Sequence, residues 1–176
     1  MRHADHVALL RDGVPVGGTW ADLGSGEGAF TLALADLVGE AGHIHSVERE
    51  ADALEAQREA MGRRFPKVAV EYIRGDFTKA LALPPLDGIV MANSLHFYRD
   101  KETLLRKLVA YLKDAGRFVL VEYDADRGNP WVPHPLSYAT WETLSHRAGL
   151  TGTREIGRVP SRFLGAIYSA LSVRAS

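Results

Sequence analysis

Short apolar runs alternate with amphipathic segments along most of the chain. The runs that predict strands are Thr19–Leu23, Ile44–Val47, Val68–Ile73, Leu86–Ala92 and Phe118–Val121. Unbroken apolar runs of this length are typical of strands that are covered on both faces of a parallel sheet. Between the runs, apolar residues recur every three or four positions, which is the period of a helix with one buried face. The alternation predicts a doubly wound α/β fold with right-handed crossovers.

Helices are expected over residues 30–38, 53–65 and 104–112, between these strands. Asp100 is the candidate N-cap of the third helix, because its short carboxylate can accept a hydrogen bond from a free backbone N–H. Gly116 stands just past the predicted end of that helix, where a glycine is favoured.

The last third of the chain no longer follows the alternation of apolar runs and amphipathic segments. Residues 124–135 contain one glycine and three prolines and predict a loop, and a helix over 138–148 follows with Ser137 as its N-cap. Two strand candidates, Thr153–Val159 and Phe163–Val173, are joined by three residues. So short a connection permits only an antiparallel pair. The predicted fold class is therefore an α/β protein with a seven-stranded, mostly parallel sheet and a C-terminal antiparallel β-hairpin.

Composition narrows the class of protein. Hydrophobic residues make up 46% and charged residues 24% of the 176 positions, which is ordinary for a soluble globular protein, and we expect a single domain over residues 1–176. There is no cysteine, which excludes disulfides, cysteine metal sites and cysteine nucleophiles. No apolar run approaches the roughly 18 residues of a membrane span, and the N-terminus does not resemble a secretory leader. A cytoplasmic location is the expectation.

Lys and Arg number 21 against 22 Asp and Glu, so the net charge is −1. Such a chain has no overall attraction to a phosphate backbone, and duplex nucleic acid is not an expected partner. The sequence does not specify an oligomeric state.

The segment Asp22-Leu23-Gly24-Ser25-Gly26-Glu27-Gly28 joins the first strand to the first periodic helix. Glycines let the backbone turn tightly and approach a ligand closely, and the following helix points its free N–H groups at the turn. Three interpretations are open at this point. The segment can be a plain turn, or a dinucleotide site, since Gly24, Gly26 and Ala29 satisfy that spacing. The third interpretation is a site for a positively charged ligand. The carboxylate of Asp22 would attract such a ligand, whereas it would repel a pyrophosphate.

The spacing Asp22-x-Gly24-x-Gly26-x-Gly28 resembles that of the class I S-adenosylmethionine-dependent methyltransferases, of the type that acts on small molecules. The resemblance extends over most of the chain. It implies S-adenosylmethionine as the cofactor and the strand order 3-2-1-4-5-7-6. It also implies a set of cofactor-binding residues, which are Asp22, Gly24, Ser25, Gly26, Gly28, Glu48, Arg49, Asp76, Phe77 and Asn93.

Four of these residues have specific roles implied by the family. Glu48, at the end of the second strand, corresponds to the acid that binds both ribose hydroxyls, and a carboxylate has the two oxygens that this requires. Asp76 and Phe77 correspond to the pair that contacts the adenine. Asn93 is expected to hold the cofactor's amine through its backbone carbonyl.

The fourth strand ends in Asn93-Ser94-Leu95-His96-Phe97. Many small-molecule methyltransferases have a Leu-His pair here, facing the methyl group. We therefore assign His96 as the catalytic residue, since a neutral imidazole can accept a proton near pH 7. The alternative is that His96 packs beside Phe97 as a loop anchor. The implied reaction transfers a methyl group to an O, N or C nucleophile of a small molecule.

Two other functions are alternatives. A non-catalytic member of the fold would bind the cofactor, or a protein, without turnover. An NAD-dependent reductase would need a hydride-site pair such as Tyr-x-x-x-Lys, which the sequence lacks.

Around the site, residues 124–135 and the turn at Arg162 are expected to form one wall of the substrate pocket, and residues 7–10 part of the other. Glu122, Asp124 and Asp126 are candidates for binding a cationic substrate group, or are solvated loop acids.

His43 and His45 are two residues apart on a predicted strand and share a face. No third ligand is near them in the sequence, so no metal site is expected.

Overall fold

The computed structural model describes residues 1–175 and contains one seven-stranded sheet of order β3-β2-β1-β4-β5-β7-β6. The strands are β1 (Gly18–Leu23), β2 (Gly42–Glu48), β3 (Ala69–Arg74), β4 (Leu86–Ala92), β5 (Leu112–Tyr123), β6 (Leu150–Ser161) and β7 (Gly165–Arg174). The first five strands run parallel, and β7 is antiparallel to both β5 and β6. The predicted fold class and strand order are confirmed.

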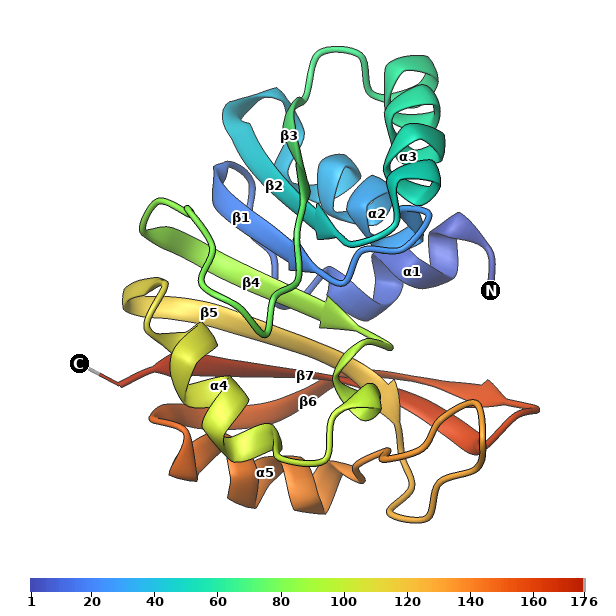
Figure 1. Ribbon diagram of the computed structural model, residues 1–176, viewed down its shortest axis with the longest axis vertical. Coiled ribbons are helices and arrows are strands. Elements are labelled where there is room, and N and C mark those ends of the chain that lie inside the picture. Colours follow the sequence, from blue (N-terminus) through green and yellow to red (C-terminus); the bar gives the residue numbers. More distant parts are fainter. Residues whose placement is uncertain (176) are drawn as a thin grey trace.

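Helices cover both faces of the sheet (Figure 1). One face carries α1 (His3–Leu10), α2 (Ala29–Val38) and α3 (Ala51–Arg64), and the other carries α4 (Lys101–Val109) and α5 (Tyr138–Arg147). Two short 3₁₀ helices, η1 (Gly39–Ala41) and η2 (Leu95–Phe97), complete the set within residues 1–175.

The two faces hold two hydrophobic cores. In β1, Trp20 packs with α1 and α2, whereas Ala21 and Leu23 face the core under α4. This alternation follows from the two-residue period of a strand, and burial on both sides explains why the central strands read as unbroken apolar runs.

The predicted caps are confirmed. Asp100 accepts a hydrogen bond from the backbone N–H of Thr103 at 3.1 Å, and Ser137 accepts one from that of Thr140 at 3.2 Å.

The predicted C-terminus of the third helix is wrong. Helix α4 ends at Val109, and Leu112 already begins β5, where it pairs with Leu86 of β4. A left-handed residue, Ala115 (φ +59°), then displaces the chain, and regular pairing resumes at Arg117. Because Leu112 is buried in either arrangement, the apolar pattern could not distinguish them.

The hairpin is longer than expected, and its turn lies at residues 162–164 rather than 160–162. Pro160 is inside β6, paired with Ala166. A proline is tolerated there because β6 is the edge strand and one side of it needs no ladder hydrogen bonds.

Within residues 1–175 no helix combines the length and apolar character needed to cross a membrane.

Gly88 lets β4 pack against the large ring of Trp20. A Cβ at Gly88 would lie 2.2 Å from the ring, whereas a Cβ at Gly62, on the exposed side of α3, meets nothing within 4 Å. We expect Gly88→Ala to lower the free energy of unfolding by about 1–3 kcal/mol through overpacking. Gly62→Ala, the matched control, should raise it by about 0.5–1 kcal/mol through helix propensity. Urea unfolding of both variants measures this, and equal stabilities would contradict it.

Candidate functional site

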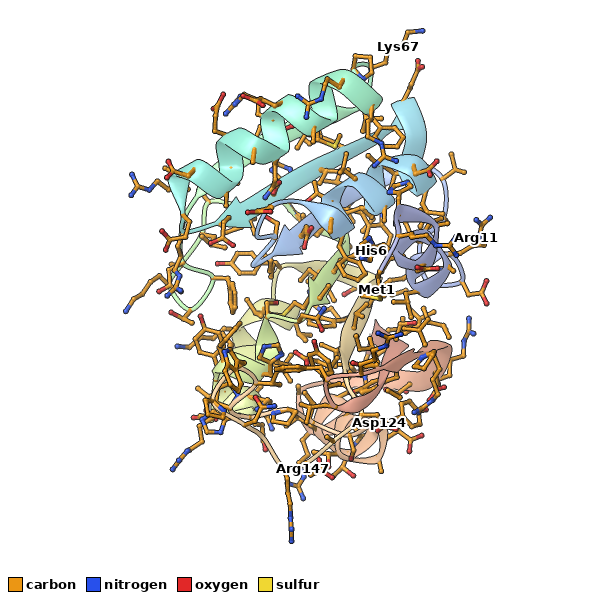
Figure 2. All side chains as sticks on the ribbon, turned by 90° about the vertical axis from the view of Figure 1, so that its right-hand side faces the viewer. Met1, His6, Arg11, Lys67, Asp124 and Arg147 are labelled. Atoms are coloured by element: carbon orange, nitrogen blue, oxygen red, sulfur yellow. The ribbon has the colours of Figure 1, made fainter. Side chains whose placement is uncertain are left out.

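A cavity of about 430 Å³ opens where the carboxyl ends of β1, β2 and β4 meet. This is the crevice at which parallel α/β sheets bind ligands, and the volume suits a small molecule. Figure 2 views the molecule from the side to which these strand ends point. Seven of the residues predicted to bind cofactor line the cavity: Gly24, Ser25, Gly26, Glu48, Arg49, Phe77 and Asn93.

The glycine turn gives the cavity an open floor. Gly26 has a left-handed backbone (φ +54°), and a Cβ there would meet nothing within 4 Å, so the space beside it is free for a ligand. Gly24 is different, because a Cβ there would lie 2.7 Å from Cβ of Ser94. Gly24 therefore allows β1 and β4 to approach each other, and Gly26 leaves room for a ligand.

A fully buried amide, that of Gln57 in α3, holds the turn from below. Its Nε2 donates to Ser25 Oγ at 2.7 Å and to the Gly26 carbonyl. Its Oε1 accepts from Ser46 Oγ at 2.7 Å and from Thr31 Oγ1 at 3.3 Å. All the donors and acceptors of this amide are used, which makes the turn rigid.

Sequence reasoning missed Gln57. It is a polar residue at a core-facing position of an otherwise charged helix, and a Cβ at Gly28 would lie 2.5 Å from its Cγ. Gly28 thus provides space for Gln57 and is not among the residues that line the cavity.

Asp22 also lies behind the turn rather than in the cavity. It is 1% exposed, and its Oδ2 accepts a 2.7 Å hydrogen bond from Thr31 Oγ1. Burial raises the pKa of Asp22 to about 7, which the Thr31 hydrogen bond opposes and the nearby charge of Glu48 reinforces. A protonated Asp22 can donate to Thr31, whose hydroxyl then donates to Gln57. Asp22 therefore supports the turn from behind and is not among the residues that line the cavity.

Glu48 connects β2 to the turn. Its Oε2 accepts the Gly26 N–H at 2.9 Å, and its Oε1 accepts the N–H groups of Arg49 at 2.7 Å and Glu50 at 3.1 Å. The carboxylate therefore has a fixed orientation at the rim of the cavity, with lone-pair capacity left for a ligand hydroxyl.

The two residues of the predicted acid–aromatic pair, Asp76 and Phe77, lie in different surroundings. Phe77 lines the cavity and packs edge-on against Tyr98, with ring centroids 5.1 Å apart. Asp76 is turned into its own loop, where Oδ1 accepts from the backbone N–H (2.9 Å) and hydroxyl (2.7 Å) of Thr78. These two hydrogen bonds lower the pKa of Asp76. Asp76 is thus a loop residue here and not part of the cavity wall.

Asn93 is the one strained residue on the cavity wall. It has a left-handed backbone (φ +53°), and its Oδ1 is buried without a hydrogen-bond partner. Backbone strain of this kind collects at functional sites, and an unpaired buried acceptor is costly unless a ligand satisfies it. The side-chain oxygen is therefore a second candidate acceptor, beside the backbone carbonyl predicted from the sequence.

His96 lies behind the cavity wall, in η2. It is 3% exposed, and its Nδ1 is 2.9 Å from Oε2 of Glu122, which is completely buried at the end of β5. The His96 backbone N–H also donates to Glu122, at 3.1 Å. A carboxylate on Nδ1 keeps the proton there and leaves Nε2 as the basic nitrogen.

The loop acids form no substrate pocket. Glu122 belongs to the His96 pair, and Asp124 binds Arg158 at 2.6 Å and the Tyr138 N–H at 2.9 Å. Asp126 accepts from Ser137 and Thr140 at the start of α5. Asp126 is exposed and is thus a solvated loop acid, Asp124 is partly buried in its ion pair, and Glu122 is fully buried.

The walls differ from expectation as well. Of residues 7–10, Val7, Leu9 and Leu10 are buried in the core, and from the N-terminal segment Met1 and His6 line the cavity (Figure 2). The 124–135 loop meets the hairpin turn through Trp131 and Phe163, whose ring centroids are 6.1 Å apart, but neither residue lines the cavity.

Known proteins resemble this chain in sequence. A family profile described as "Methyltransferase domain" matches residues 16–149. The chain belongs to the methyltransferase-domain family. The ubiquinone/menaquinone biosynthesis C-methyltransferase UbiE of Klebsiella pneumoniae is 32% identical over 131 residues, which are 72% of this chain and 49% of that protein. The chain thus spans about half the length of the curated relatives it matches.

Solved structures share the fold. The YcgJ protein from Bacillus subtilis superimposes with a TM-score of 0.78 at 13% identity, covering 99% of this chain and 100% of that chain. An S-adenosylmethionine-dependent methyltransferase from Aquifex aeolicus gives a TM-score of 0.74 at 21% identity, covering 96% and 89%. The resemblance to class I methyltransferases is therefore confirmed for family and fold.

The buried Asp22 carboxyl predicts a pH dependence of stability. The unfolded chain releases this proton near the ordinary pKa of about 3.9, whereas the folded protein holds it up to about pH 7. The stabilisation is therefore full below pH 4 and is lost as the pH rises to 7. Asp22→Asn keeps the acceptor for Thr31 but cannot ionise.

Between pH 5 and pH 8 we expect wild type to lose on the order of 2 kcal/mol of unfolding free energy relative to Asp22→Asn. Urea unfolding at the two pH values, without ligand, measures the difference. Parallel pH profiles for the two proteins would show that Asp22 does not retain its proton.

Proposed function

We propose that the chain is an S-adenosylmethionine-dependent methyltransferase acting on a small molecule, with residues 1–176 working as one domain. The observation that carries the proposal is the pairing, in one cavity, of open space at Gly26 with the unpartnered Oδ1 of Asn93. The ligand that fits is one that lies flat on the turn and donates a hydrogen bond from a cationic group. S-adenosylmethionine has such an amine, and it supplies a transferable methyl group on a cationic sulfonium.

The chain's own residues divide the binding between them. Asn93 Oδ1 would accept from the amine, Gly26 would admit the central part of the cofactor, and Glu48 would accept from the ribose hydroxyls at the rim. Phe77 and Tyr98 offer ring surfaces for the adenine, on the side of the cavity next to β3. Arg49 follows Glu48 on that rim.

The acceptor would approach from the aromatic side of the site. Phe97 is 58%, Trp131 70% and Phe163 46% exposed, which is unusual for such large apolar side chains. Tyr123 connects His96 to this surface, with ring centroids 6.0 Å from His96 and 5.8 Å from Phe163. These rings would bind an apolar, ring-containing acceptor better than a charged one.

His96 and Glu122 would supply the base. Glu122 orients the imidazole and stabilises the cation that forms when Nε2 takes a proton from the acceptor's O, N or C nucleophile. Because His96 is behind Phe97 (ring centroids 4.4 Å apart), the exposed Phe97 ring would have to move for the acceptor to reach Nε2. A cytoplasmic location and a small-molecule partner, rather than duplex nucleic acid, stay predictions from the sequence.

Cofactor binding is tested at Gly26 and Glu48. Gly26→Val should abolish binding, because its side chain would occupy the cavity. Gly152→Val is the control, since Gly152 also has a positive φ (+62°) and open surroundings but does not line this cavity. Glu48→Ala should weaken binding by roughly 1.5–3 kcal/mol, the scale of a charge-assisted hydrogen bond.

Calorimetric titration with S-adenosylmethionine, and with NAD⁺ as the competing ligand class, measures these affinities. Unchanged S-adenosylmethionine affinity in Gly26→Val, or binding of NAD⁺ alone, would exclude the proposed function.

The base is tested by the rate of S-adenosylhomocysteine release with a panel of phenols and hydroquinones as acceptors. Once an acceptor is found, His96→Asn should lower the rate by about 10²–10⁴-fold with cofactor affinity nearly unchanged. Glu122→Gln should shift the pH profile of the rate as well as lower it, which a merely structural role would not do. A rate for His96→Asn within a few-fold of wild type would make His96 a loop anchor. Cofactor binding without turnover of any acceptor would favour the non-catalytic alternative.

A further inference from the structure

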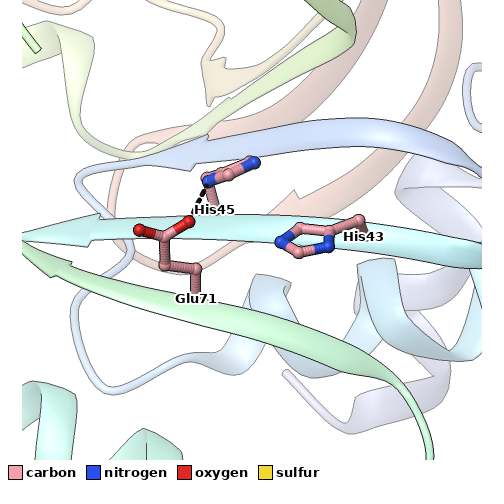
Figure 3. A group of neighbouring side chains, drawn as sticks. All are labelled: His43, His45 and Glu71. Carbon is pink, nitrogen blue, oxygen red and sulfur yellow. Dashed lines mark ion pairs between the residues drawn. The ribbon is translucent and has the colours of Figure 1, made fainter. Parts of the chain in front are cut away.

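Three potential metal ligands lie together on the sheet, away from the cofactor cavity. His45 of β2 is directly opposite Glu71 of β3 in the parallel ladder, and His43 is two residues earlier on the same face of β2. One ligand atom from each of the three side chains lies within 4.8 Å of the other two (Figure 3). None of the three lines the cavity. The strand register therefore supplies the third ligand that the sequence spacing did not reveal.

The ring nitrogen of His45 is an unsatisfied group. His45 is 6% exposed, and its Nδ1 is buried with no hydrogen-bond partner. Oε2 of Glu71 is 3.0 Å from this nitrogen, an ion-pair distance that applies only when the imidazole is protonated. Buried ring nitrogens normally have a partner, and a cation bound between this nitrogen, the carboxylate and the second imidazole would provide one.

The two imidazole rings are stacked, with centroids 4.7 Å apart, and a nitrogen of each ring lies within 4.8 Å of the other and of a Glu71 oxygen. The geometry of the three side chains therefore brings their ligand atoms into one small region.

We propose that His43, His45 and Glu71 form a binding site for a divalent transition metal ion of the zinc type. Two imidazoles and one carboxylate are a ligand set that Zn²⁺ accepts, with water in the fourth tetrahedral position. Around an ion with bonds of about 2.0–2.1 Å, ligand atoms are roughly 3.3 Å apart, so the side chains must close by a small movement. His43 and Glu71 are exposed, so the core does not enclose either side chain.

The ion would connect the edge strand β3 to β2. Glu48 lies three residues after His45 in β2. Its backbone carbonyl accepts a 2.9 Å hydrogen bond from the N–H of Gly75, the first residue after β3. The metal site and the rim of the cofactor cavity therefore share these two strands. Its role would be to stabilise the folded chain, separate from the methyl-transfer chemistry.

The test is titration of the tag-free, metal-stripped chain with Zn²⁺ in a calorimeter, and with Co²⁺ by visible absorption. We expect one ion per chain, a tetrahedral Co²⁺ spectrum and a rise in melting temperature with Zn²⁺. His43→Ala and Glu71→Gln should each weaken binding by at least about tenfold. Both residues are exposed, so these variants should fold, which circular dichroism checks.

Matched controls are His146→Ala and Glu59→Gln, the same substitutions at exposed positions on α5 and α3. Both should bind the metal as wild type does. No saturable binding by wild type, or equal binding by wild type and both site variants, would overturn the proposal. So would loss of binding in His3→Ala or His6→Ala with the site variants unaffected, because the N-terminal segment would then hold the ion. None of these outcomes depends on methyltransferase activity.

Discussion

The amide of Gln57 is the contact on which the ligand-binding turn depends. It replaces the water that would otherwise solvate the backbone of a glycine-rich turn, and it does so from a fully buried position. Through Thr31 it reaches Asp22, and through Ser46 it reaches β2, so one side chain connects three elements around the turn. A partly satisfied amide would cost more than an apolar residue there, which is why every one of its partners matters.

This network explains why the glycines and acids of the turn have different structural roles. Gly28 gives Gln57 its space, Gly24 lets β4 approach, and only Gly26 faces free volume. In the same way, Asp22 belongs to the buried support, whereas Glu48 orients the rim. A single short motif thus contains residues that line the cavity and residues that hold those residues in place.

Sheet order places the two halves of the proposed site. Because β1 is between β2 and β4, the strand ends that carry Gly24, Glu48 and Asn93 converge on one cavity. The neighbouring strand β5 then brings Glu122 under His96, and the hairpin of β6 and β7 brings Phe163 toward Trp131. The proposed cofactor side is built on parallel strands, and the proposed acceptor side on the antiparallel end of the sheet.

The sequence by itself determined the local elements of this protein. Hydrophobic period, caps and glycines act over a few residues, and they correctly predicted the parallel strands, the caps at Asp100 and Ser137, the glycine turn after the first strand and the hairpin. An apolar residue such as Leu112 would be buried either at the end of a helix or in a strand. The hydrophobic pattern therefore assigned it to the wrong element, because burial does not specify backbone conformation.

Only the tertiary structure decided which polar residues meet. Gln57 and Ser25 are 32 residues apart, His96 and Glu122 are 26 apart, and Glu71 reaches His45 through strand register alone. Such pairs leave no periodic signal, since each partner follows the rules of its own element. The sequence identified candidate residues. The packing of β2, β3 and α3 decided which of them lie together in one site.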